Sequence, residues 1–470
     1  MFAPHIYYPW YHYSWKMVLE NPLIPFAVGL LTVVLLLVWL KLPAFVGLII
    51  ATFVVGIVTT EVPIVDVPTT TAEAFGEILV GIGIPILMAA IIGKTLMESG
   101  AAERIVRGFL GLTGKDNSEF ALLGSSYVLS IPVFFDNVFY LLAPIGRSMR
   151  ARTGGKYAIY ISVLGAGALG THMLVPPTPG PLAMAAELNV DLGLAILVGM
   201  SVALPTTLVG GVVYGRWIDQ RMDIPLREAM GTTSESIQET ADKSTAELPG
   251  LAESSLPIAL PVALIAANTI AGVAVPEGSS ILSATGFFGD PNIALTLAAL
   301  AATGTFYRMS DLDKEALGDE LTEALKSGGN IIAITAAGGA FGAMLQTAGI
   351  GDYIAEGLGE VGIPLLLTGW LIAGLIRVAQ GSGTVAILTG AAIMAPLTGG
   401  AGVHPVWMMM AVGTGGMLFA WYNDSGYWIV KEVSGITQAE TFKTFSAVNF
   451  VMSITGITVV LILSTLFPLT

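Results

Sequence analysis

Repeated apolar stretches are the feature of this sequence that most limits its fold. Most have close to the roughly 20 residues that an α-helix needs to cross a bilayer, beginning with residues 22–40 and 44–60. Only 11% of the 470 residues are charged, whereas a soluble domain carries about 25%. The stretches lack the residue-by-residue alternation of a membrane β-barrel. The sequence therefore predicts an all-α polytopic membrane protein.

One apolar region, 363–397, contains Arg377 and a Gly-Ser-Gly break at residues 381–383. A rise of ~1.5 Å per residue would carry Arg377 about 20 Å along a helix from Pro364. A permanent charge at that depth usually marks a binding or ion pathway. Backbone amides freed by a break are tolerated there only when they are buried in protein or line a cavity. The alternative is a straight helix whose arginine extends to an interface; we favour a hairpin with a binding tip.

Four interruptions of the apolar stretches form two corresponding pairs. Residues 131–137 (IPVFFDN) and 377–384 break two regions that we interpret as hairpins, while 172–181 and 423–426 break two spans that follow them. A few identical residues recur in the two halves, always separated by the same number of positions, which indicates an internal duplication. The residues concerned are Gly93, Leu96, Gly100 and Ile105, matched by Gly342, Leu345, Gly349 and Ile354.

The distribution of Lys and Arg residues predicts how the two repeats are oriented in the membrane. We divide the chain into an external aromatic segment (1–21), a first repeat (22–215), a polar cytoplasmic linker (216–255) and a second repeat (256–470). Five crossings and one re-entrant hairpin per repeat would invert the second copy, so that broken helices meet at the midplane. With both termini external, all 20 Lys and Arg residues except Lys16, Lys94 and Arg377 are cytoplasmic, as the positive-inside rule requires. Inverted repeats with broken helices are typical of secondary transporters.

Polar segments between the spans are interpreted as loops. We expect a polar connection around Asp66 and Glu73, and cytoplasmic loops around Arg104 and Arg107 and over residues 308–326.

The breaks indicate a small organic anion with hydroxyl groups as substrate. Helix N-termini with free amides favour an anion, and a guanidinium pairs with a carboxylate through two parallel hydrogen bonds. The residues predicted to bind substrate are Arg377, Gln380, Gly381, Ser382, Gly383, Thr384, Asn137, Thr171, Asn423 and Ser425.

Asp136, Asp424 and His172 are the candidates for carrying a proton, because a poorly hydrated cavity and a neighbouring cation shift carboxylate protonation in opposite directions. Each has a structural alternative. Asp136 would cap its own backbone, Asp424 would cap a helix within the turn sequence NDSG, and His172 would hold the break together. His404 is interpreted as structural. Which residue couples, and whether the ion is a proton or sodium, stays open.

Several classes of function are disfavoured. The chain has no cysteine, no HExxH motif and no P-loop, so we expect no metal, no cofactor and no ATP-driven step. The net charge of −14 does not suit a nucleic-acid partner. A membrane hydrolase would need Asp136 and Asp424 in one catalytic site, and an anion channel would need a continuous polar pore. Nothing in the sequence requires either, so we predict that the protein is not an enzyme.

Three runs in the second half, ITAAGGAFGAMLQTAGIGDYIA, RVAQGSGTVAILTGAAIMAPL and NDSGYWIVKEVSGITQAETFKT, strongly resemble the gluconate permease family of gluconate:proton symporters in the ion transporter superfamily. IPVFFD and HMLVPPTPGP resemble the counterparts in the first half, and the resemblance covers most of residues 75–465. It implies proton-coupled symport of gluconate, a related aldonate, glycerate or D-serine across the inner membrane, with sodium coupling as the alternative. It also implies a homodimer in which a mobile transport domain moves against a scaffold like an elevator.

Overall fold

A computed structural model describes residues 21–114, 117–153, 155–227, 229, 245–276, 278–349, 365–398, 402–421 and 424–469. Every regular element in these ranges is a helix, which confirms the all-α class. Five of the helices described are long and apolar enough to cross a membrane, or six if a bent pair counts as one span. Residues 1–20 of the predicted N-terminal segment and residues 228 and 230–244 of the predicted linker lie outside the described ranges.

The chain begins with α2 (Leu23–Val34), the π-helical η1 (Leu35–Trp39) and α3 (Ala44–Val58). The next helix, α4 (Val67–Glu98), bends by 51° between Gly81 and Gly83. Pro85 follows the bend, and its ring removes one helical hydrogen bond. The polar connection predicted around Glu73 is wrong, because the helix already includes this residue.

The loop predicted around Arg104 and Arg107 is also wrong, because these residues belong to α5 (Ala101–Thr113). Ile105 and Val106 are buried on one face of α5, while both arginines are partly exposed. This amphipathic pattern is shorter than a membrane span, and a search for long apolar runs does not detect it.

Two breaks in the first half fall where the sequence places them. α6 (Ser118–Leu129) and α7 (Phe135–Thr153) are separated by residues 130–134, and α8 (Tyr157–Leu174) and α9 (Pro179–Glu187) by residues 175–178. The last span of this half is continuous through α10 (Leu192–Thr207), η2 (Leu208–Val213) and α11 (Tyr214–Asp219).

The second half opens with η3 (Thr245–Glu247), α13 (Leu251–Ala274), α14 (Ser280–Phe288) and α15 (Pro291–Met309). The charged loop predicted over 308–326 is wrong except at residues 310–313, since α15 extends to Met309 and α16 (Lys314–Thr347) runs unbroken for 34 residues. Asp313 caps its start by accepting a hydrogen bond from the Ala316 amide, 2.8 Å away. α18 (Leu365–Gln380) and α19 (Gly383–Thr398) then flank the predicted Gly-Ser-Gly break.

The chain ends with α20 (Pro405–Gly415), α21 (Ser425–Ser434), α22 (Gln438–Thr441), η4 (Phe442–Ser446) and α23 (Ala447–Leu466). Each half thus presents a long helix, then a pair of helices around a break, then a broken helix. The inverted relation of the halves stays a prediction.

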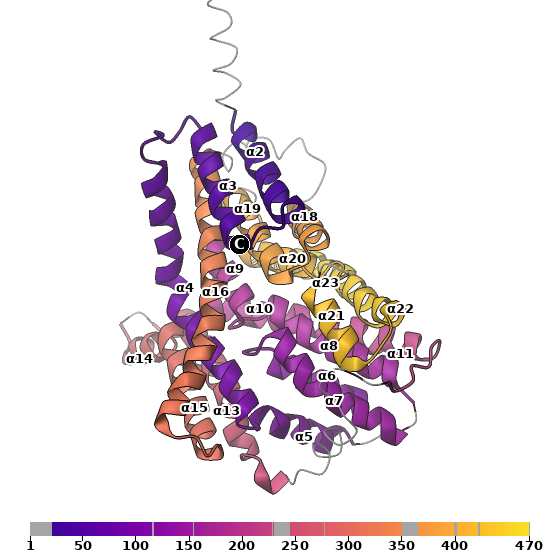
Figure 1. The fold of residues 1–470 in the computed structure, drawn as a ribbon. Coiled ribbons are helices and arrows are strands. Elements are labelled where there is room, and N and C mark those ends of the chain that lie inside the picture. The colour runs from indigo at the N-terminus through magenta and orange to yellow at the C-terminus, as the bar shows by residue number, and fades with distance from the viewer. Residues whose placement is uncertain are drawn as a thin grey trace, which may run out of the picture.

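The helices form two regions around a buried centre. The long α4 and α16 pack along each other on one side, and α6, α7, α21 and α22 lie on the other (Figure 1). Between them, all residues of α8 are buried, and α8 packs against α6, α7 and α10. The break after α8 therefore lies in the protein interior, and Gly381 in the break after α18 is buried as well.

Candidate functional site

A cavity of about 380 Å³ lies where the broken helices meet. Its walls come from the first turns of α7, α19 and α21, from the end of α8, and from one face of α16. The lining residues are Phe134, Phe135, Asp136, Asn137, Leu169, His172, Met173, Ser327, Asn330, Ile331, Ile334, Arg377, Ser382, Gly383, Thr384, Val385, Asp424, Ser425, Gly426 and Phe445.

A buried ion pair crosses this site. Arg377, near the end of α18, places Nη2 against Oδ2 of Asp424, and the two residues are only 4% and 3% exposed. Nη1 of the same guanidinium donates to the Gly381 carbonyl over 3.0 Å, so the arginine also closes the break after α18. Its Nε has no hydrogen-bond partner in the described part of the chain. The charge is therefore fixed in place, and its Nε–H group is left without an acceptor.

Asp424 serves two roles in this geometry. Its Oδ1 accepts a hydrogen bond from the Tyr427 amide over 3.2 Å, which caps the N-terminus of α21. Its Oδ2 pairs with Arg377. Asp424 thus caps α21 and lines the cavity at the same time, and its role in carrying a proton stays a prediction.

Three helix N-termini lie at the cavity, those of α7, α19 and α21. A helix N-terminus carries a partial positive charge of about half a unit, so together the three favour an anion. Gly383 keeps the start of α19 open, since a β-carbon there would lie 2.9 Å from Nη1 of Arg377 and 3.0 Å from the Met173 methyl carbon. Gly381, at φ +93°, makes a turn that glycine adopts without strain.

Asp136 and His172 approach the same cavity from α7 and α8. His172 is 8% exposed, and its ring makes an edge contact with the Phe134 ring at 6.1 Å between centroids. Among the residues described, its Nδ1 has no hydrogen-bond partner. All three proton-carrying candidates therefore border one space.

Most of the predicted substrate-binding residues meet there too. Arg377, Ser382, Gly383, Thr384, Asn137 and Ser425 line the cavity, and Gly381 contributes its carbonyl to Arg377. Thr171 is absent from the lining, because its hydroxyl donates to the Tyr127 carbonyl at 2.8 Å inside the helix packing. Asn423 and the side chain of Gln380 lie outside what the structure describes. His404 caps α20 through its Nδ1, which accepts from the Val406 amide.

Sequence reasoning missed the contribution of α16. Ser327 and Asn330 lie three positions apart, hence on one face of the helix, and both line the cavity. The one available signal was a polar pair directly before an apolar run.

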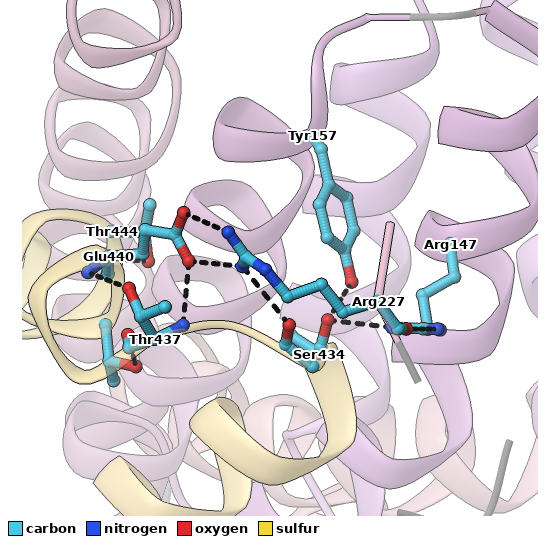
Figure 2. Close-up of polar contacts among 9 residues, drawn as sticks. Arg147, Tyr157, Arg227, Ser434, Thr437, Glu440 and Thr444 are labelled. Atoms are coloured by element: carbon cyan, nitrogen blue, oxygen red, sulfur yellow. Dashed lines mark hydrogen bonds and ion pairs between the residues drawn. The ribbon is translucent and has the colours of Figure 1, made fainter. Parts of the chain in front are cut away.

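A second cluster fixes α7 and α21 at the ends remote from the cavity (Figure 2). Arg147 of α7 donates to the carbonyls of Ser434 (2.8 Å) and Arg227 (2.5 Å), and the Tyr157 hydroxyl donates to the same Ser434 carbonyl over 2.7 Å. Arg227 in turn holds Glu440 through two hydrogen bonds of 2.6 and 3.0 Å. The two helices that supply Asp136 and Asp424 are therefore clamped together.

A cavity at helix breaks, inside a bundle with several helices long and apolar enough to cross a membrane, is the arrangement of a multi-pass membrane transporter. The chain belongs to the GntP family, because the sequence model described as "GntP family permease" matches residues 21–466.

Relatives with similar sequences are transporters too. The chain is 33% identical to a gluconate permease of Pseudomonas aeruginosa, over 93% of this chain and 96% of that protein. It is 31% identical to the high-affinity gluconate transporter of Escherichia coli (94% and 99% covered) and 28% identical to the Gnt-II system L-idonate transporter of the same species (93% and 97%). These relatives are permeases and transporters, not enzymes.

Two solved structures share the fold at low sequence identity. The YdaH transporter of Alcanivorax borkumensis matches with a TM-score of 0.60 and 13% identity, over 93% of this chain and 98% of that one. MtrF of Neisseria gonorrhoeae matches with a TM-score of 0.62 and 16% identity, over 85% and 84%.

Proposed function

We propose that this protein is a secondary active transporter that carries gluconate, or a closely related hydroxycarboxylate, together with protons. The observation that carries the proposal is the Arg377–Asp424 pair in a cavity bordered by three helix N-termini. Such a site favours a substrate with one carboxylate group. The names of the relatives point to sugar acids of gluconate type.

The carboxylate of the substrate would bind at Arg377. The unused Nε–H and the second N–H of an Nη group form a fork that fits a carboxylate. Hydroxyl groups along the carbon chain would then contact Asn137, Thr384 and Ser425, and on the opposite element Ser327 and Asn330. Ser382 and Gly383 offer the amide end of α19, where an anion is favoured.

Coupling follows from competition for the arginine. In the empty site, Arg377 neutralises Asp424. An arriving carboxylate takes part of that interaction, which leaves excess negative charge between Asp136, Asp424 and the substrate. A proton added to either acid relieves the same charge, so substrate and proton binding support each other. A sodium ion could replace the proton in this scheme, and it is the alternative that the experiment below separates.

The architecture proposed for this mechanism has two inverted repeats, 22–215 and 256–470, each with five crossings and one re-entrant hairpin (α6–α7 and α18–α19). The matching order of helix breaks in the two halves supports it. Both termini would face outward from an inner membrane, and a homodimer would provide the scaffold for an elevator motion.

Counterflow in proteoliposomes tests the proposed function. Vesicles preloaded with unlabelled gluconate should take up labelled gluconate transiently in sodium-free buffer, with glycerate and D-serine as competitors of unequal strength. A channel gives no such overshoot, because it does not exchange one bound molecule for another. Absence of gluconate counterflow, with or without sodium, would reject the proposal.

A further inference from the structure

A carboxylate outside the cavity has no evident role in the mechanism above. Glu187, the last residue of α9, is half-buried at the end of the candidate span Tyr157–Glu187. No hydrogen bond or ion pair joins it to any other residue in the described part of the chain. An ionised carboxylate without a partner is costly among apolar helices.

The carboxyl group fits against two glycines of α16. A β-carbon on Gly339 would lie 2.9 Å from Oε2 of Glu187, and one on Gly342 would lie 2.5 Å from Oε1. Any side chain at either position would displace the acid. The small-residue surface AAGGAFG therefore does more than pack helices, because it leaves room for this group.

A backbone carbonyl without its regular helical donor borders the same space. The β-carbon position of Gly342 also lies 2.9 Å from the carbonyl oxygen of Ala392 in α19. In a regular helix that carbonyl accepts from the amide four residues later, but this position is Pro396, which has no N–H. The Ala392 carbonyl thus lacks its helical donor beside an unpartnered carboxyl group.

On the described helices that pack against α9, no basic residue is available to balance the charge. Apart from Glu187 itself, there is no Lys, Arg, His, Asp or Glu in α9, α19, α20 or residues 330–347 of α16. On α8 the ionisable groups are Tyr157, Tyr160 and His172, which belong to the packing and the cavity already described. On α4, Glu73, Glu77, Lys94 and Glu98 are the charged residues; Lys94 is held by Glu98 and Glu320. On α10, Asp191 caps the helix start.

We propose that Glu187 and the Ala392 carbonyl form a proton-binding site separate from the substrate cavity. Protonated Glu187 gains an O–H donor, and the freed carbonyl is the acceptor at hand. Two oxygens suffice to share a proton, whereas a hard metal cation such as Ca²⁺ takes about 6–8 oxygen ligands.

The site would link protonation to the contact of α9 and α19 with α16. Neutral Glu187 can pack on Gly339 and Gly342, while the ionised form needs water or a cation and weakens that contact. This role in transport rests on the proposed proton coupling, but the protonation itself does not.

Infrared spectroscopy of the purified full-length protein in lipid, without substrate, tests the proposal. The carbonyl stretch of protonated carboxyl groups is recorded while pH is varied. Glu187→Gln should remove one component that is present in the wild type near neutral pH. Glu77→Gln, at an exposed acid on α4, is the matched control and should leave that component in place. Identical spectra for Glu187→Gln and wild type would overturn the proposal.

Pro396→Ala gives a second test that keeps the acid. The alanine supplies an amide donor to the Ala392 carbonyl, so the protonated carboxyl loses its acceptor and its band should weaken at a given pH. An unchanged band would contradict the pairing of the two groups. Failure of gluconate counterflow in the wild type would reject the proposed substrate without affecting either infrared result.

Discussion

Arg377 and Asp424 form a buried ion pair that joins the end of α18 to the first turn of α21. Removing one member of such a pair leaves an uncompensated buried charge, at a cost of about 3–5 kcal/mol. The pair therefore holds the site in shape when it is empty, and it presents the cation to an incoming carboxylate. Substitutions that keep the charge are the informative ones.

Arg377→Lys should weaken gluconate binding by about 10–100-fold. Lysine keeps the positive charge but loses the planar fork, and one charge-assisted hydrogen bond contributes about 1.5–3 kcal/mol. The measurement is the half-saturating gluconate concentration in counterflow. Arg308→Lys, in a surface pair with Glu253, is the matched control. Wild-type affinity in Arg377→Lys would mean that Arg377 does not bind the substrate.

Asp136→Asn should keep exchange but lose accumulation. The amide retains the size of the side chain but cannot take up a proton in the cavity. Counterflow of labelled gluconate should therefore persist, while uptake driven by a pH gradient in sodium-free buffer disappears. Asp66→Asn, at an exposed acid before α4, should behave like wild type. If Asp136→Asn still concentrates gluconate, coupling belongs to Asp424 or His172.

Asn330→Ala should affect long sugar acids more than short ones. Losing one hydrogen bond of about 1 kcal/mol raises the half-saturating concentration of gluconate roughly fivefold. Glycerate, with fewer hydroxyl groups, should be affected less. Gln346→Ala, exposed near the end of the same helix, is the control. Equal effects on both acids would show that Asn330 acts on the fold and not on the substrate chain.

Arg147→Met should destabilise the protein by about 1–3 kcal/mol, because the Ser434 carbonyl loses one of its two hydrogen bonds and the partly buried Arg227 carbonyl loses its bond to the guanidinium. Tyr157→Phe, which removes one bond to the shared Ser434 carbonyl, should cost only about 1 kcal/mol. Thermal unfolding in detergent measures both. A smaller loss for Arg147→Met than for Tyr157→Phe would argue against the clamp between α7 and α21.

The helix breaks could be predicted from sequence because their chemistry is local. Gly-Ser-Gly at 381–383 and the prolines at 176–181 cannot continue an apolar helix, and Arg377 needs a polar partner wherever it is buried. The same logic identified Asp136, Asp424 and His172 as neighbours of one site. It did not identify the partner of Arg377, because sequence alone does not decide which acid the guanidinium faces; the structure pairs it with Asp424.

The missed features depend on tertiary packing. Ser327 and Asn330 sit in an unbroken helix, and only the arrangement of α16 decides which of its faces meets the cavity. Thr171 looked like a ligand because it begins a break, yet its hydroxyl is used by the Tyr127 carbonyl of α6. The amphipathic α5 and the charged start of α16 are helical because their apolar faces pack on neighbours, although their composition resembles loops.

The central claim is tested most directly by accumulation of labelled gluconate in proteoliposomes of the wild-type protein. An inward proton gradient is imposed in sodium-free buffer, with and without a protonophore. We predict that gluconate rises above its external concentration and falls back when the protonophore collapses the gradient. Uptake that only equilibrates, or that is concentrated solely by an inward sodium gradient, would contradict proton-coupled transport by this site.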